Sequence, residues 1–98
     1  MIITKLEFLE RAKIDPPTLE VWIEEEWLIP GQTARDLAFT EMDLARANLI
    51  HDLKDKMGVN DEGLGVILHL IDQMHALRRA LSDTLKTARE QQSPSARG

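Results

Sequence analysis

The sequence has no cysteine among its 98 residues, and aromatic side chains make up only 4% of it. Without cysteine the chain can form neither a disulfide framework nor a thiolate zinc site, and we expect a protein of a reducing, cytoplasmic compartment. A chain of this length buries roughly two-thirds of the surface that its unfolded form exposes. The length therefore predicts one domain with a modest core and leaves little room for a deep cofactor cavity.

Long apolar runs are missing as well. No stretch approaches the ~18 unbroken apolar residues that a membrane-spanning helix needs. The first ten residues, MIITKLEFLE, contain acids and lack both a basic region and a long apolar segment, so we expect no signal peptide. A membrane is therefore not an expected partner.

Basic residues are absent from residues 15–30, where five acids occur. The formal net charge of the whole chain is −5, and residues 1–30 hold seven acids against three bases. Residues 61–98 hold five acids and five bases, so nearly all of the excess negative charge lies near the N-terminus. This asymmetry is the first indication of function.

Prolines and glycines divide the first half of the chain into short segments with helical periodicity. Thr4 is a typical N-cap residue, and the spacing predicts a short helix that ends near Lys13 with Ile3, Leu6 and Leu9 on its apolar side. A second helix is expected after Asp15, with the two prolines in its first turn.

The apolar residues of this second helix recur at the spacing of one buried stripe, which consists of Leu19, Trp22, Ile23 and Trp27. We expect both tryptophans to lie in the core rather than to anchor a partner. The opposite face carries Glu20, Glu24 and Glu25. This face is either a solvated acidic surface or a docking surface for a partner.

Residues 31–39 are too few and too mixed for a helix, but they suffice for a small hairpin, or wing. Thr40 is expected to begin a third helix, which Gly58 ends. Its predicted buried stripe consists of Met42, Ala45, Ile50, Leu49, Leu53 and Met57.

The most regular apolar pattern belongs to the last predicted helix. Seven of eight seam positions over more than three heptads are apolar: Leu64, Ile67, Ile71, Met74, Leu81, Leu85 and Ala88, with Arg78 as the exception. Leu68, Leu70 and Leu77 add a second apolar stripe in the first half. Because a small head cannot bury this whole seam, we expect a homodimer with the interface residues Leu64, Ile67, Ile71, Met74, Leu81 and Leu85. The alternative is a helix that folds back over its own domain.

These segments predict an all-α chain in three parts. The parts are a head over residues 1–60, a long amphipathic dimerisation helix over residues 61–91 and a disordered tail over residues 92–98. The fold class follows from the helical period of nearly every segment between the breakers.

Residues typical of catalysis or metal binding do not occur in workable arrangements. The three histidines have no serine or cysteine placed as a nucleophile partner. His69 and His75 are separated by nearly two helical turns, so at most one of them could share an ion with Asp72, and solvated side chains are the simpler interpretation. Consecutive glutamates at 24–26 point in different directions on a helix. We therefore predict no enzyme, no cofactor and no metal site.

The order of two short helices, a wing, a third helix and a long pairing helix resembles the winged helix-turn-helix head and C-terminal dimerisation helix of MerR-type regulators. The residues that carry this resemblance are Thr18, Leu19, Leu28, Ile29, Pro30, Phe39 and Thr40. The second helix departs from it, because Glu20, Val21 and Trp22 stand where those regulators have an arginine and tyrosines.

This departure argues against DNA as the partner. Groove-reading helices obtain most of their binding from cations that replace counterions at phosphates, so a helix with glutamates and no Lys or Arg is repelled by a duplex. The wing offers only Arg35, which is offset by Asp36. A MerR-type transcriptional regulator that binds DNA as a dimer through another surface is the alternative function.

The passage LHLIDQMHALR, residues 68–78, points to a narrower family. Its matching positions are Leu68, Leu70, Ile71, Asp72, Met74, Leu77 and Arg78. From about residue 3 to residue 85 the chain resembles the CbpM-type chaperone modulators, which have this fold without DNA binding. That resemblance implies a small protein that binds the J-domain of a CbpA- or DnaJ-like co-chaperone and inhibits its stimulation of the Hsp70 chaperone.

The resemblance also implies a mechanism that the charge distribution can accommodate. J-domains present a basic helical surface to Hsp70, and a modulator that covers this surface would block the stimulation. We expect Glu20, Glu24 and Glu25 to supply the complementary charge. Asp72, with its neighbours on the last helix, is the competing docking surface.

Overall fold

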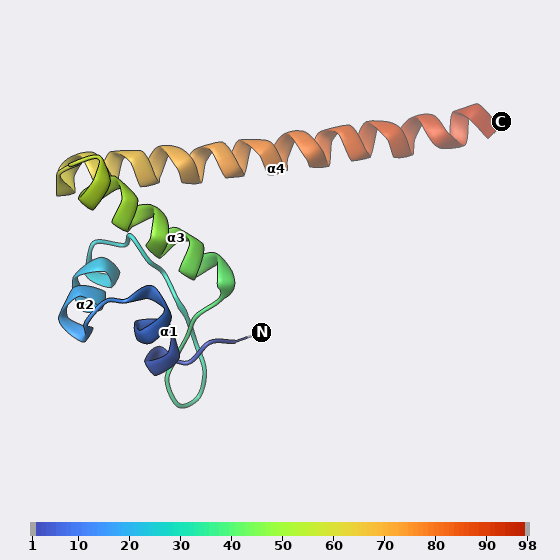
Figure 1. The fold of residues 1–98 in the computed structure, drawn as a ribbon. Helices are drawn as coiled ribbons and strands as arrows, with labels where there is room; N and C mark the ends of the chain where they lie inside the picture. The colour runs from blue at the N-terminus through green and yellow to red at the C-terminus, as the bar shows by residue number, and fades with distance from the viewer. Residues whose placement is uncertain (1, 98) are drawn as a thin grey trace. The chain divides into compact units, whose positions relative to one another are not determined.

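The computed structural model describes the backbone of residues 2–97 and the side chains of residues 2–91. The elements of this part are α1 (Lys5–Ala12), α2 (Pro16–Glu24), β1 (Gly31–Gln32), β2 (Leu37–Ala38), α3 (Glu41–His51), the π-helical turn η1 (Asp52–Lys56) and α4 (Asp61–Arg97) (Figure 1). They form two compact units, Met1–Gly65 and Val66–Gly98. The predicted fold class, a helical head with a wing-like hairpin followed by a long C-terminal helix, is confirmed.

The backbone of α4 continues beyond residue 91, where the sequence predicts the end of the helix and a disordered tail over residues 92–98. Residue 98 and the side chains of residues 92–97 lie outside the described part of the chain. The three-part division at residues 60 and 91 stays a prediction.

Helix α1 begins as its sequence predicts, but it buries a different face. The Glu7 backbone N–H donates to Thr4 Oγ1 at 3.2 Å, which caps the helix. Phe8 and Ala12 form the buried face, whereas Leu6 is exposed. Of the predicted apolar side, Ile3 is buried and Leu9 is half-buried, so the prediction is wrong at Leu6.

Phe39 determines which face of α1 is buried. Its ring stacks on Phe8, with the ring centroids 4.2 Å apart and the planes 15° from parallel. Its backbone also forms an antiparallel bridge with Ile3, in which each residue donates its N–H to the other's carbonyl at 2.8 and 3.0 Å. Ile3, Phe8 and Phe39 are buried, and they join the N-terminal segment to the end of the hairpin.

Asp15 caps the N-terminus of α2, and the two prolines lie in the first turn, where a missing N–H does no harm. The Thr18 backbone N–H donates to Asp15 Oδ1 at 3.0 Å. Leu19 and Trp22 are buried on the inner side of the helix, as predicted.

The Asp15 cap should make the stability of the protein depend on pH. Hydrogen bonds from the Thr18 side chain and from the Thr18 backbone lower the pKa of Asp15 below its ordinary value. The stabilisation by the carboxylate is therefore complete above the unfolded pKa of about 3.9 and is lost as the pH falls through the lower folded pKa. Asn caps helices without titrating.

We therefore expect the melting temperature of the wild type to fall more than that of Asp15→Asn between about pH 5 and about pH 2. The measurement is thermal unfolding followed by circular dichroism at each pH. Every other carboxylate is common to both proteins, so parallel curves would show that the cap contributes no pH dependence.

Helix α2 ends earlier than the apolar stripe suggests, at a left-handed turn. Glu26 has φ 62°, its N–H donates to the Ile23 carbonyl at 3.0 Å, and the Trp27 N–H donates to the Trp22 carbonyl at 2.9 Å. These two bonds form a Schellman motif with a glutamate at the position that glycine usually occupies. The turn returns Trp27 to the core, so both tryptophans are buried, as predicted.

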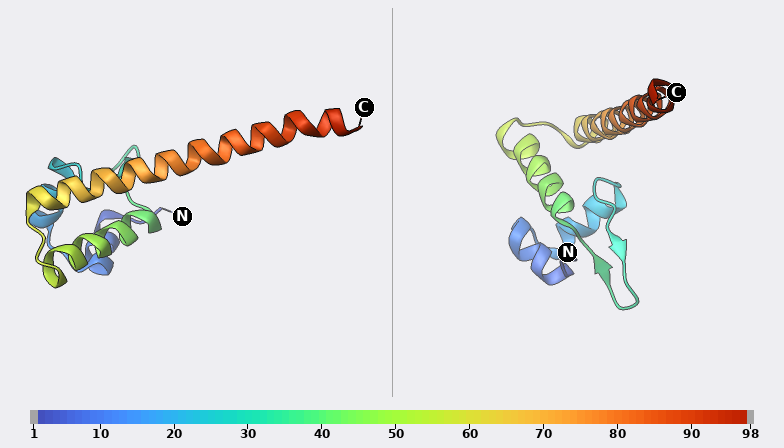
Figure 2. Two further views of the ribbon diagram at one scale, coloured as in Figure 1. Left: turned by 90° about the horizontal axis from the view of Figure 1, so that it is seen from above. Right: turned by 90° about the vertical axis from the view of Figure 1, so that its right-hand side faces the viewer.

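The predicted wing is a two-stranded hairpin. Gly31 pairs with Ala38 and Gln32 with Leu37 in an antiparallel register, and the right-hand view of Figure 2 draws the strands as arrows. At its tip, the Thr33 side chain and backbone N–H both donate to the Asp36 carbonyl, at 2.9 and 2.8 Å. The hairpin therefore has an internally bonded turn.

Helix α3 begins with a capping box: Thr40 Oγ1 accepts from the Asp43 N–H at 3.3 Å, and Asp43 Oδ2 accepts from the Thr40 N–H at 2.9 Å. The buried residues of α3 and η1 are Leu44, Ala47, Ile50 and Leu53. Met42 and Met57, which the sequence assigns to the buried stripe, are exposed. Of the predicted stripe, Ile50 and Leu53 are buried and Leu49 is half-buried, as predicted. The prediction is wrong at Met42, Ala45 and Met57, because apolar residues occupy two overlapping faces of α3 and because the wider π-turn changes the helical phase before Met57.

The start of α4 is fastened to the head. Gly58 has φ 65° and ends the preceding helical segment, as predicted, and the Gly63 N–H donates to Asn60 Oδ1 at 2.7 Å as a cap. Lys54 Nζ lies 3.1 Å from Asp61 Oδ1 and 5.5 Å from the ring centroid of Trp27. Across residues 2–97, no helix has both the length and the apolar character that crossing a membrane requires.

Candidate partner-docking surface

The outer side of α2 is an exposed acidic face, which we call the acidic face and define by Glu20, Val21, Glu24 and Glu25. All four residues are exposed, and Val21 is 47% exposed between the carboxylates. Glu26, in the turn that follows, is exposed as well. The face thus offers negative charge around a single apolar side chain.

The carboxylates of the acidic face have no basic partner within the described residues. Ion pairs of the head that lie elsewhere join Arg11 to Glu7 and Glu41, Lys54 to Asp61 and Lys56 to Asp52. Residues 15–30 contain no base, so this segment itself supplies no positive charge to offset its carboxylates. A partner with a basic surface could meet this face without breaking existing ion pairs.

The inner side of α2 is held by contacts with its neighbours. The Trp22 ring meets the His51 ring edge-on, with centroids 5.3 Å apart. His51 Nε2 lies 3.1 Å from the Ala12 carbonyl, which can only accept, so this nitrogen carries the hydrogen. Arg46 donates its Nε–H to the Trp27 carbonyl after the end of the helix. These contacts orient α2 and present the acidic face to solvent.

The other predicted docking residue, Asp72, is exposed on α4 and belongs to the second compact unit. It has an interaction within the chain, in contrast to the carboxylates of the acidic face. His69 and His75 are exposed on the same helix, and in the described part of the chain no three metal-binding side chains are grouped around a common point.

The predicted dimer interface is exposed only in part. Leu64 is fully buried, so it is not available to a partner, and Ile67 and Ile71 are half-buried. Met74, Leu81 and Leu85 are exposed, and so are Leu70 and Leu77, which the sequence places in a second stripe rather than in the interface. The exposure of Leu70 and Leu77 could not be predicted from the helical periodicity, because both stripes of α4 are apolar.

The head has the architecture of a winged helix-turn-helix domain. The residues between Ala12 and Pro16 form a tight turn that joins α1 and α2, the hairpin follows, and α3 completes the unit. In this class of domain the second helix of the helix-turn-helix is the one that reads DNA, and here that helix carries the acidic face.

The chain belongs to the MerR helix-turn-helix family. The family profile described as MerR HTH family regulatory protein matches residues 3–86, which include the head and most of α4. Proteins of this regulatory family are typically non-enzymatic. No curated protein and no solved structure matches the chain.

Proposed function

We propose that the protein is a non-enzymatic chaperone modulator of the CbpM type, which binds the J-domain of a CbpA- or DnaJ-like co-chaperone and inhibits its stimulation of Hsp70. The observation that carries the proposal is the acidic face on the helix that a DNA-binding relative would use for the duplex. Glu20, Glu24 and Glu25 are exposed, and no basic residue lies in residues 15–30.

The sign of the partner's charge distinguishes a DNA duplex from a basic protein surface. A duplex carries one negative charge per ~1.7 Å of its axis, so it repels an uncompensated acidic helix at the distance of groove contact. A basic helical protein surface is attracted by the same field, which raises the association rate and sets the orientation. Most of the binding energy would come from a few side chains that lose their water on binding. Val21 is an exposed apolar residue among the glutamates of α2 and is suited to this role.

Inhibition follows from competition for one surface. The basic helical surface of a J-domain is the surface that Hsp70 uses, and a protein seated on it excludes Hsp70. The modulator then needs no catalytic group, which agrees with the character of the family. We further propose that the protein is a homodimer held by the apolar residues of α4.

The alternative function is a MerR-type transcriptional regulator that binds DNA as a dimer, and membership of the MerR family is compatible with both functions. Its DNA surface would have to use the bases outside α2. The exposed bases of α4 include Arg78, Arg79, Lys86 and Arg89.

Three parallel assays test the proposal. Immobilised J-domain should retain the protein at low salt and release it as the salt concentration rises, because the attraction between exposed charges is screened. Increasing amounts of the protein should lower the Hsp70 ATPase rate that a J-domain protein stimulates. A mobility shift with a mixed-sequence DNA duplex at the same salt should show no complex. A salt-sensitive duplex shift without J-domain retention would instead establish the alternative.

A further inference from the structure

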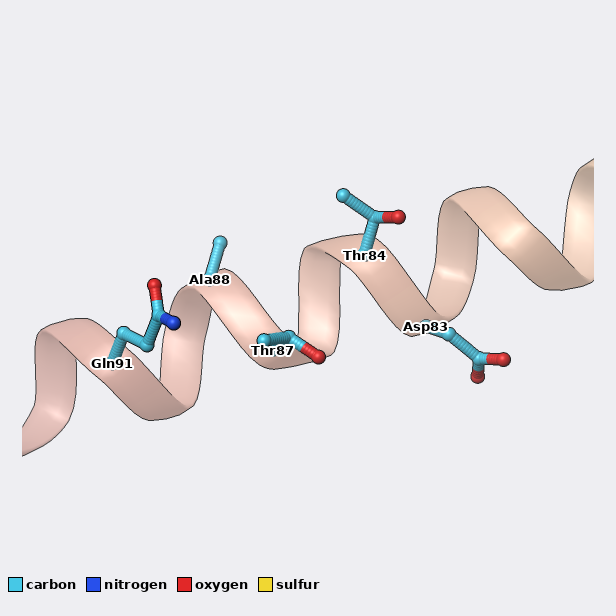
Figure 3. Close-up of a pocket in the computed structure, with 5 residues that line it drawn as sticks. All are labelled: Asp83, Thr84, Thr87, Ala88 and Gln91. Atoms are coloured by element: carbon cyan, nitrogen blue, oxygen red, sulfur yellow. The ribbon is translucent and has the colours of Figure 1, made fainter.

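A shallow depression on α4 is too open to hold a small ligand. It has a volume of about 350 Å³, and Figure 3 shows its lining residues on this one helix: Asp83, Thr84, Thr87, Ala88 and Gln91. All five are exposed, whereas a ligand site encloses most of the ligand's surface. The head contains a more specific arrangement, in which the side chain of His51 lies among residues of three other elements.

His51 is the last residue of α3, and it is half-buried. Its Nε2 lies 3.1 Å from the carbonyl oxygen of Ala12, the last residue of α1. Its Nδ1 lies 3.5 Å from Asp55 Oδ2 in η1. Its ring meets the Trp22 ring of α2 edge-on, with the centroids 5.3 Å apart. One side chain therefore contacts both helices of the helix-turn-helix.

The Ala12 carbonyl needs a donor from outside α1. In a continuing helix this oxygen would accept from the N–H four residues later, but that residue is Pro16, which has no N–H. Ala12 is buried, and a buried carbonyl without a donor is destabilising. The Nε2–H of His51 supplies this donor. The sequence at the turn between α1 and α2 thus creates the need that His51 meets.

The contact with Trp22 constrains the rotation of α2 about its own axis. Trp22 is buried on the inner side of α2, whereas Glu20, Glu24 and Glu25 are exposed on the outer side. Side chains of one helix stand at fixed angles to one another, so a rotation that moves the Trp22 ring moves these carboxylates by the same angle. Because His51 connects the Trp22 ring to the end of α1, it fixes the direction in which the acidic face points.

Resting on the docking function proposed above, we infer that His51 is the positioning residue of the acidic face. Its hydrogen bond to Ala12 and its ring contact with Trp22 hold α2 in the orientation that a basic partner binds. His51 acts through α2 and does not itself touch the partner. Its loss leaves every carboxylate of the acidic face in place, so affinity should fall while the salt dependence of binding is retained.

Two uncharged replacements separate the hydrogen bond from the ring contact. His51→Gln keeps an N–H donor at about the reach of Nε2 and loses the ring, whereas His51→Phe keeps a ring beside Trp22 and loses the donor. An unpaired buried carbonyl costs more than a lost edge-on contact. We therefore expect His51→Phe to bind a J-domain about 10-fold more weakly than the wild type, and His51→Gln to stay within about threefold of the wild type.

A merely structural role would lower stability without changing the affinity of the folded protein. The full-length variants are therefore compared at a temperature at which circular dichroism shows each of them folded. Phe8→Leu, which loosens the stack on Phe39, is the destabilised control and should bind as tightly as the wild type. Amide hydrogen exchange of residues 20–24 needs no partner, and it should be faster in His51→Phe than in the wild type and close to the wild-type rate in His51→Gln.

The failure of this inference can be told apart from the failure of the docking function. Wild-type exchange rates in His51→Phe, or an equal loss of affinity in Phe8→Leu, would overturn the positioning role and leave J-domain binding standing. Equal losses in His51→Gln and His51→Phe would also overturn it, because the hydrogen bond would then not hold α2. A wild type that binds no J-domain would overturn the docking function instead, and the exchange rates alone would then decide whether His51 fixes α2.

Discussion

Replacing Glu20, Glu24 and Glu25 together by lysine is expected to weaken binding to a J-domain at low salt by roughly 100-fold, or about 2.8 kcal/mol. All three side chains are exposed on one face of α2 and have no basic partner among the described residues. The substitution turns attraction to a basic partner into repulsion, and like charges across an interface cost several kcal/mol. Titration of the J-domain by calorimetry or fluorescence anisotropy measures the loss.

The control for this variant carries the same change in net charge at other places. Glu10, Asp83 and Glu90 are exposed and lie on α1 and α4, so their joint replacement by lysine should change J-domain affinity only slightly. If the two triple variants lost affinity equally, net charge rather than the acidic face would govern binding. If neither lost affinity, the J-domain would have to dock elsewhere, and Asp72 on α4 would be the next residue to test.

The Phe39→Ala variant is expected to lose about 3–5 kcal/mol of the free energy of unfolding. Phe39 is fully buried and stacks on Phe8. Its truncation opens a cavity beside Phe8 and Ile3, in a head whose core is small. Domains of this size have about 5–15 kcal/mol of stability in total, so the variant should be close to unfolding.

Urea unfolding followed by circular dichroism gives this difference, with Met42→Ala as the matched control. Met42 lies near Phe39 in the chain but is exposed, so its truncation should change the free energy of unfolding by no more than about 0.5 kcal/mol. A loss below about 1 kcal/mol in Phe39→Ala would contradict the role of this side chain as the centre of the core.

Features of the fold that depend on neighbouring residues could be predicted from the sequence. Thr4, Asp15 and Thr40 begin helices because their side chains bond to backbone N–H groups three residues later, and all three caps are present. The end of the helical segment at Gly58 and the hairpin at residues 31–38 could likewise be predicted from neighbouring residues. The core position of Trp22 follows from the helical period that it shares with Leu19.

Features that depend on distant residues could not be predicted in this way. Phe8 is buried in place of Leu6 because Phe39, far along the chain, stacks on it. Periodicity cannot choose between the two apolar faces of α3, and it cannot anticipate the π-turn that separates Ile50 from Met57.

The acidic face and the apolar stripe of α4 also differ in how far the sequence alone could predict them. The acidic face was visible in the sequence because charge composition and helical spacing define it. The exposed apolar residues of α4 could be identified only from the structure, since Leu64 and Leu77 look equally suited to an interface until Leu64 is found to be buried. Burial is a property of the packed chain, and no local pattern contains it.

The bridge between Ile3 and Phe39 has a consequence for the order in which the protein folds. It closes a loop that contains α1, α2 and the hairpin, so these elements leave the ribosome before the residue that covers Phe8. Closing the loop costs chain entropy that only the later contacts offset. We expect the head to be complete only after Phe39 has been synthesised, and nascent chains that stop before this residue to remain sensitive to protease.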